Sequence, residues 1–493
     1  MKNSKIRPLV ILLAVMLFLL ASSCNTQFSF NSTQNDKELD PLKENQFYAL
    51  NVASNKFYIV TAEELYENDT CVIWAEEGSG ITPEEAEIIA NEYDTKIRPR
   101  TVDNFGKDGI LEFANWLAGR NDDKLTILLL DIQDGYDPPE NSSFVAGYFF
   151  ANDFYPKGPH RNNVGRVTFY SNSRDMIYID TNPGLDSDKV PREDVYATFA
   201  HELQHLINFA TSVLQGRGYM DTWVDEGLSS QAEYFYLEKN PAVKCQWFSE
   251  DPIKTIEKGN NFFVWDNHKN EPMAIHDEYA TVYLFFRWLY LQADEQQQKR
   301  IFYDIITSEY SDYEAVTSAA ESINSDWEDW ETLLRTWFAA NYAPANHDYG
   351  YKGDTYLQGI VKVKPIGNIS ISLYPGEGVY SFNSNSFNHL PTGNIRYAGI
   401  DANSSTIDIS APPYAGTVLL TFNANSNNRE NSETGYLTGV NSSPSNARSI
   451  AGETQTWQFT GPYILDARDV LGRNQETGPP FVFLRPNMIK AEN

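Results

Sequence analysis

The spacing of apolar residues divides the chain into a mixed first part and a helical second part. Before residue 192, short continuous or alternating apolar runs predict strands at 71–75, 125–132, 144–150 and 176–180. Farther along, apolar residues recur at a spacing near 3.6, which predicts helices at 195–209, 223–236, 279–291 and 327–340. The first part is therefore expected to form a twisted sheet backed by helices.

One helix of the first part, expected at 83–93, has its own start signal. Thr82 and Glu85 have the spacing of a capping box, in which each side chain accepts a hydrogen bond from the other residue's backbone N–H. Pro83 stands at the first helical position, where its missing N–H costs nothing. The helix is expected to begin at Pro83.

The pattern changes again after Pro344 and the glycine-rich residues 349–353. Runs rich in β-branched residues at 369–373, 406–410 and 417–422 are separated by clusters of Asn, Ser, Gly and Pro, which predicts an all-β, sandwich-like domain. The predicted fold class is α+β. Its parts are a sheet subdomain at 47–191, a helical subdomain at 192–348 and a β-sandwich-like accessory domain at 349–493.

The first 23 residues have the pattern of a signal peptide. Basic residues precede an unbroken apolar run from Leu9 to Ala21, which is shorter than the roughly 20 residues that a membrane-spanning helix needs. The following Ser22-Ser23-Cys24 resembles a bacterial lipoprotein signal, although the leucine usual three places before the cysteine stands four places before it. The resemblance implies lipidation of Cys24 and a lipid-anchored protein of the bacterial cell envelope, facing the periplasm or the cell surface. An ordinary cleaved signal is the alternative.

Residues 24–46 are polar and are interpreted as a tether between this anchor and the folded part. The 67 acidic residues against 38 basic ones give a net charge of −29, which argues against a nucleic-acid partner. The acidity is typical of a soluble surface, and structural calcium or basic substrates are alternatives. With three cysteines, the chain lacks the count for a disulfide scaffold or a zinc ribbon. Cys71 and Cys245 could pair in an oxidising compartment.

The segment from His201 to His205 reads His-Glu-Leu-Gln-His and falls within a predicted helix. Residues four apart share one helix face, so the two imidazoles can reach a single metal ion while Glu202 projects beside them. A helix start is marked just upstream by Pro191 and by two acids near the positive helix end. Catalytic zinc takes three protein ligands and one water, so a third ligand is needed.

The next helical segment, 223–229, reads Trp-Val-Asp-Glu-Gly-Leu-Ser and contains acidic candidates for that ligand. Together with His-Glu-Leu-Gln-His-Leu-Ile-Asn at 201–208, it resembles the gluzincin clan of zinc metallopeptidases, and within it the hyicolysin family. The likeness extends over about residues 85–290 and is specific at these two motifs. It implies that Glu226 is the third zinc ligand and Glu202 the general base. Twenty residues separate His205 from Glu226, slightly more than in other gluzincins.

The expected chemistry also needs a donor for the oxyanion that forms at the scissile carbonyl. A catalytic tyrosine begins a comparable helix in gluzincin aminopeptidases, which makes Tyr279 the first choice here, with Tyr283 and His276 behind it. A packing role is the alternative, because the chain has 29 tyrosines. Asp225, Ser230 and Glu233 are candidates for orienting the histidines, and a solvated helix face explains the two acids as well.

Substrate binding in such enzymes uses an edge strand that pairs with the peptide backbone, and residues 144–150 are the candidate here. The Gly-x-Met-Glu-Asn motif of gluzincin aminopeptidases is absent from the sequence, which favours an endopeptidase acting on proteins or peptides. The competing hypothesis is a surface lipoprotein adhesin, or a glycan- or protein-binding module, that keeps the fold without the catalysis. Its support is the predicted β domain.

Overall fold

The computed structural model describes most of the chain between residues 38 and 437. The described residues are 38–138, 144–259, 262–263, 275–368, 370–382, 387, 389–401, 417–426 and 432–437, with the backbone of 481–484. The signal segment, Cys24, the tether as far as residue 37 and the strand predicted at 406–410 lie outside them. In this part of the chain, no helix is long and apolar enough to cross a membrane.

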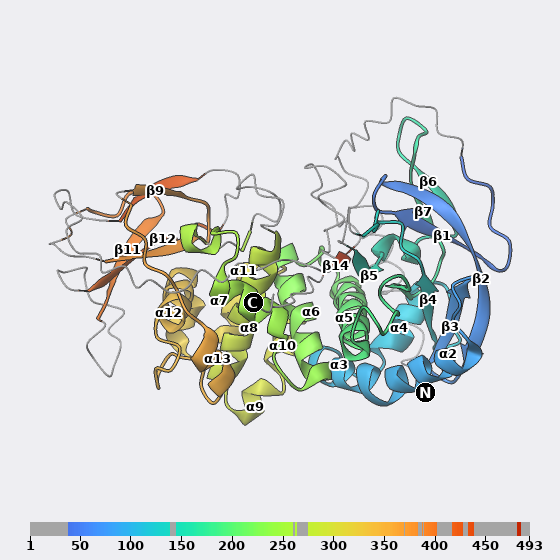
Figure 1. Ribbon diagram of the computed structural model, residues 1–493, viewed down its shortest axis with the longest axis horizontal. Coiled ribbons are helices and arrows are strands. Elements are labelled where there is room, and N and C mark those ends of the chain that lie inside the picture. Colours follow the sequence, from blue (N-terminus) through green and yellow to red (C-terminus); the bar gives the residue numbers. More distant parts are fainter. Residues whose placement is uncertain are drawn as a thin grey trace, which may run out of the picture. The chain divides into compact units, whose positions relative to one another are not determined.

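The described residues group into two compact units (Figure 1). The first contains residues 38–220, 232–239 and 481–484, and the second contains residues 221–231 and 240–437. The helix α6 (Thr222–Leu237) is continuous and contributes residues to both units.

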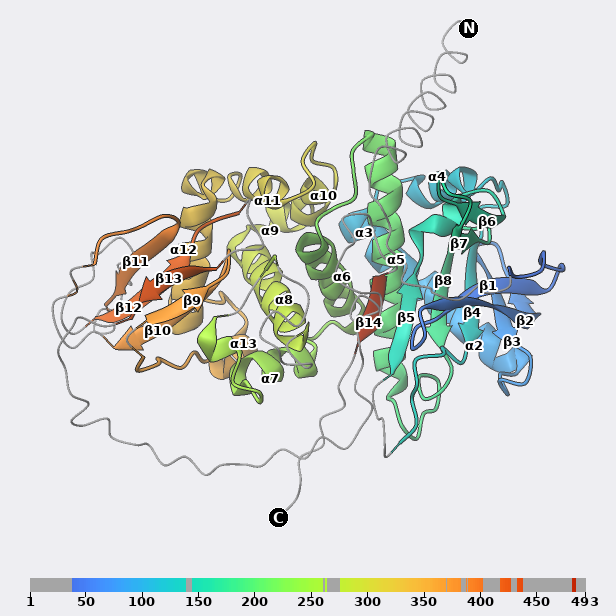
Figure 2. The same ribbon diagram turned by 90° about the horizontal axis from the view of Figure 1, so that it is seen from above.

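A seven-stranded sheet organises the first unit, in the order β1-β2-β3-β4-β8-β5-β14 (Figure 2). The strands are β1 (Gln46–Asn51), β2 (Lys56–Glu67), β3 (Cys71–Glu76), β4 (Leu125–Leu130), β8 (Met176–Asp180), β5 (Val145–Phe149) and β14 (Phe481–Leu484). Strands β3, β4 and β8 are parallel, and the remaining pairs are antiparallel. A separate hairpin joins β6 (Gly158–Arg161) and β7 (Val167–Ser171).

The central strands are those with continuous apolar runs, because both faces of the sheet are covered there. Every residue of β4, β5 and β8 is buried. The strands predicted at 71–75, 125–132, 144–150 and 176–180 are confirmed within two residues at each end. The α+β fold class is also confirmed.

The helices of the first unit are α2 (Pro83–Glu92), α3 (Arg98–Phe105), α4 (Ile110–Leu117) and α5 (Arg192–Gln215), and a π-helical turn joins α2 to α3. The capping box of Thr82 and Glu85 is present at the start of α2, as predicted. Helix α5 is longer than the prediction of 195–209. It ends at Gly216, whose φ of 68° is left-handed and suits a glycine C-cap.

Helix α5 lies close against β5 because a glycine stands at the contact. A Cβ on Gly147 would lie 2.9 Å from the Tyr178 carbonyl oxygen and 3.0 Å from Thr198 Cγ2. Farther along the same two elements, the rings of Phe149 and Phe209 are 5.9 Å apart. Strand β5 therefore runs beside the stretch of α5 between Thr198 and Phe209.

The second unit is mainly helical around an aromatic core. Besides part of α6, it contains α7 (Ala242–Glu250), α8 (Ile275–Gln292), α9 (Glu295–Gln298), α10 (Ile301–Ile306), α11 (Tyr313–Ala320), α12 (Trp330–Tyr342) and α13 (Thr355–Ile360). The Trp223 ring lies 5.9 Å from that of Phe285 and 5.5 Å from that of Trp330. The helix predicted at 327–340 begins later, because residues 325–328 form a 3-10 turn and Asp329 caps α12.

Two small sheets follow these helices. One has the order β10 (Gly378–Phe382), β12 (Val418–Asn423) and β11 (Ile395–Ile400), and the other pairs β13 (Glu433–Tyr436) with β9 (Ser370–Leu373). Leu373, Val379, Ile395 and Leu437 form one buried cluster between them. Packing of this kind is typical of a small sandwich.

The two cysteines of the folded part are both free and buried, so no disulfide joins Cys71 to Cys245. Cys71 lies on β3 in the first unit, and Cys245 lies on α7 in the second. Burial raises the pKa of the Cys71 thiol to about 12, which leaves it protonated and unreactive at neutral pH.

We predict that Gly227→Ala destabilises the protein. A Cβ at Gly227 of α6 would lie 2.2 Å from the buried Phe286 ring of α8, so the two helices would have to separate. We expect a loss of about 1 to 3 kcal/mol in the free energy of unfolding, measured by urea denaturation. Gly359→Ala is the matched control, because this helical glycine has open space around it, and it should stabilise by up to about 1 kcal/mol. Equal effects of the two changes would contradict the packing argument.

Candidate metal centre

Helix α5 presents His201 and His205 from consecutive turns. The two imidazole rings are 4.8 Å apart, and neither side chain is exposed to solvent. Glu193 and Asp194 occupy the first turn of the helix, where negative charge is favourable. The independent helix signals in the sequence therefore position the two imidazoles on one face.

Helix α6 carries two buried glutamates seven residues apart, Glu226 and Glu233. Seven residues are close to two full turns, so the two carboxylates share one face of the helix. Gly227, next to Glu226, allows the close contact with Phe286 that fixes this end of α6 against α8.

The ligand atoms of His201, His205 and Glu226 all lie within 4.8 Å of one another, and all three residues are buried. Among the described residues, this is the one group of His, Cys, Asp and Glu side chains that meets the geometry of a metal site. A second acidic cluster suited to structural calcium is not seen in that part of the chain.

Glu233 fixes the orientation of one of these imidazoles. Its Oε1 lies 2.8 Å from His201 Nδ1, and the exposed fractions of the two side chains are 1% and 0%. A carboxylate that accepts from Nδ1–H selects the tautomer whose Nε2 carries a free lone pair. The sequence offered Asp225, Ser230 and Glu233 for this role, and the structure shows the contact for Glu233.

The donor set fits a divalent transition metal. Two neutral imidazoles and one carboxylate are the ligands that catalytic zinc takes, and zinc holds such atoms at about 2 Å. A buried carboxylate beside two imidazoles is costly unless a cation or hydrogen bonds compensate for it. Glu202 follows His201 directly and is also fully buried, so an acid stands next to the metal ligands.

The three candidates for the oxyanion donor, His276, Tyr279 and Tyr283, lie on the first half of α8. Tyr279 is 2% exposed, and the Lys244 ammonium lies 5.6 Å from the centre of its ring. The Tyr283 hydroxyl donates a 2.7 Å hydrogen bond to Asn240 Oδ1, which gives it a structural role. His276 packs on Trp247, and burial lowers the pKa of its imidazole to about 3, so it is neutral at pH 7.

Lys244 is a buried residue that the sequence reasoning missed. Its Nζ donates a 2.8 Å hydrogen bond to Ser230 Oγ, one turn after Glu226 on α6. The same ammonium group therefore contacts both α6, through Ser230, and the ring face of Tyr279 on α8. No sequence signal separates this lysine from surface lysines, because its segment lacks a motif and burial is decided by tertiary packing.

The chain is similar to a neutral metalloprotease. It is 27% identical to the neutral metalloprotease ShpI of Staphylococcus hyicus over 334 residues, which cover 67% of this chain and 69% of that protein. No family model matches the chain. The similarity and the His-His-Glu cluster together support a metallopeptidase with a protein or peptide substrate.

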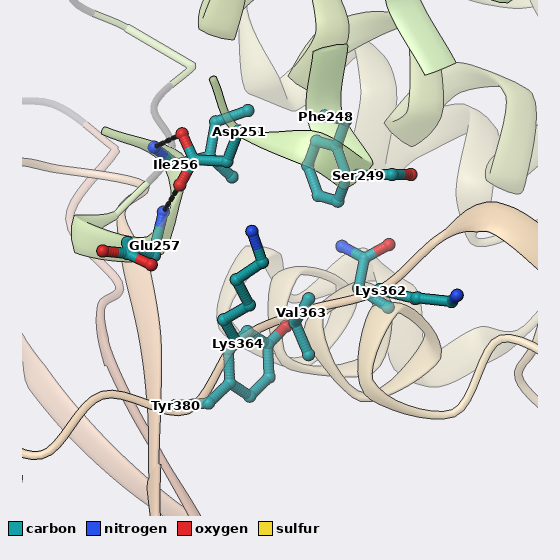
Figure 3. Close-up of a pocket in the computed structure, with 10 residues that line it drawn as sticks. Phe248, Ser249, Asp251, Ile256, Glu257, Lys362, Val363, Lys364 and Tyr380 are labelled. Carbon is teal, nitrogen blue, oxygen red and sulfur yellow. Dashed lines mark hydrogen bonds between the residues drawn. The ribbon is translucent and has the colours of Figure 1, made fainter. Parts of the chain in front are cut away.

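A small cavity in the second unit is separate from these residues. It is lined by ten residues, among them Asp251, Lys364 and Tyr380, and none of the ten belongs to the metal cluster (Figure 3). Its volume of about 20 Å³ is close to the space that one water molecule needs.

We predict that substitutions of Glu233 weaken metal binding in a graded way. Glu233→Gln keeps an oxygen that can accept from His201 but removes the charge, and Glu233→Ala removes both. We expect zinc affinity to fall by about 10-fold and 100-fold respectively, measured by competition with a chromogenic chelator. Glu238→Gln, an exposed glutamate just beyond the same helix, is the control. If zinc binds equally well to the alanine variant, Glu233 does not hold the imidazole.

Proposed function

We propose that this protein is a zinc-dependent endopeptidase of the gluzincin type, related to the hyicolysin family. The observation that carries the proposal is the buried convergence of His201, His205 and Glu226, with Glu202 next in the chain to the first ligand. The similarity to a neutral metalloprotease supports the same class of reaction.

Each residue of the candidate site has a separate role in the proposed peptide hydrolysis. His201, His205 and Glu226 would hold a zinc ion, which when bound lowers the pKa of water and polarises a carbonyl group. Glu202 accepts the proton of the attacking water and passes it to the leaving amine. Glu233 keeps the His201 ring in the orientation that its Nε2 needs.

Tyr279 is proposed as the donor to the oxyanion. The cation beside the Tyr279 ring favours the phenol as a hydrogen-bond donor to developing negative charge. An endopeptidase is favoured over an aminopeptidase, because the sequence lacks the motif that reads a free amino terminus.

We propose further that Cys24 carries a lipid and holds the protein at the bacterial cell envelope, facing the periplasm or the cell surface. The support is the signal-like sequence of residues 1–24. Labelling of producing cells with an alkyne fatty acid should mark the wild type and leave Cys24→Ala unmarked. Equal labelling of both forms would place the lipid elsewhere, and labelling of neither would favour an ordinary cleaved signal.

We predict that Glu202→Gln abolishes hydrolysis without removing the metal. Loss of the general base should lower kcat by at least about 10²-fold, because an amide cannot accept the proton. Casein and gelatin cleavage measures activity, and elemental analysis measures zinc in the same preparations. Glu193→Gln is the control, since this glutamate lies on the same helix and is half exposed.

The experiment also separates the enzyme from the rival function. A zinc-loaded wild type that cleaves no faster than Glu202→Gln would show that the mechanism is wrong. If no preparation cleaves any member of broad peptide libraries, the result favours the alternative function of a surface adhesin or binding module. The small sheets of residues 370–437 support that alternative.

A further inference from the structure

The edge of the sheet beside α5 is occupied by the chain itself. Strand β14 pairs antiparallel with β5, with Phe481 opposite Phe149, Val482 opposite Tyr148 and Phe483 opposite Gly147. Figures 1 and 2 both show β14 beside β5 and α5. Residues 144–150 were predicted to contain the strand that pairs with substrate, and in the structure a seventh strand covers the outer edge of β5.

The covered edge lies next to the metal ligands. Gly147 of β5 contacts Thr198, one turn before His201, and Phe149 contacts Phe209, one turn after His205. All these residues belong to the first unit. A backbone paired with the outer edge of β5 therefore runs alongside the turns of α5 that carry both imidazoles.

The pairing of β14 is short and interrupted. Pro480 precedes the strand and Pro486 follows it closely, and proline has no N–H to donate to a sheet. The register shifts between Phe483 and Leu484, where Leu484 lies opposite Val145. A strand of four residues with a shift in register contributes few main-chain hydrogen bonds, so another peptide can replace it.

We propose that β14 is an internal competitor of the substrate: it fills the peptide-binding edge of β5 and must leave before a substrate strand can pair there. This inference rests on the proposed peptidase function. Strand addition is read through main-chain groups, so one segment can substitute for another of different sequence. Because β14 is tethered to the same chain, it competes at a high effective concentration.

The test removes the pairing in the full chain. Successive N–H groups of a strand point to opposite sides, so the double substitution Val482→Pro and Phe483→Pro removes a donor to β5 whichever residue supplies it. The matched control places the same two prolines at Met488 and Ile489, outside the paired register. The readout is kcat and KM on a fluorogenic peptide.

We expect the double-proline chain to have a KM about tenfold lower than the wild type, with kcat changed less than twofold. A synthetic peptide of residues 477–487 should raise its apparent KM competitively, back towards the wild-type value. An unchanged KM, or loss of activity together with a lower melting temperature, would overturn the proposal, because β14 would then be a structural strand.

A measurement on the unaltered strand checks the same point without turnover. In the Glu202→Gln chain, saturating substrate peptide should speed hydrogen exchange at the amides of residues 481–484 by at least about tenfold, since displaced amides lose their partners. Unchanged protection while the peptide is bound would show that β14 is not displaced. Absence of hydrolysis in every form would instead count against the peptidase function. Binding of a labelled 477–487 peptide would then still test the edge of β5, because the peptide should bind more tightly to the double-proline chain than to the wild type.

Discussion

The hydrogen bond between Glu233 and His201 determines how the buried polar groups of α5 and α6 are oriented. Imidazole and carboxylate groups lose hydration when they are buried, and they are stable there only with partners. The 2.8 Å contact supplies one partner and directs the other ring nitrogen away from it. With Glu226 on the same face of α6, the remaining lone pairs converge on one point, which is the arrangement that a cation stabilises.

Two glycines make this arrangement possible, because each lacks a side chain where two elements pack closely together. Gly147 allows α5 to lie against β5, and Gly227 allows α6 to lie against Phe286 of α8. A methyl group at either position would push α5 or α6 away from the element that supports it. The glycine beside Glu226 therefore has a packing explanation, in addition to its place in the motif.

Much of the architecture could be predicted because the relevant signals are local. Periodicity located α5, α6 and α8, and the spacing of four residues between His201 and His205 identified them as two candidate metal ligands. Glu226 needed the resemblance to a family, because no spacing rule selects one acid among several. Strand β2 was missed since it is half exposed and rich in glutamate, which lowers strand propensity. Lys244 and β14 depend on long-range contacts, and a local pattern does not encode these.

The outer edge of β5 links the candidate metal site on α5 to strand pairing in the sheet. A metal cluster by itself explains how a bond is broken but not how a chain is held across it. Strand pairing holds a backbone in an extended form and in a fixed register along β5. Gly147 and Phe149 pack β5 against α5 on both sides of the two imidazoles. Any backbone paired there is thus placed by main-chain groups alone. The backbone of β14 already pairs with β5 in this way, which shows that this edge can hold an extended chain.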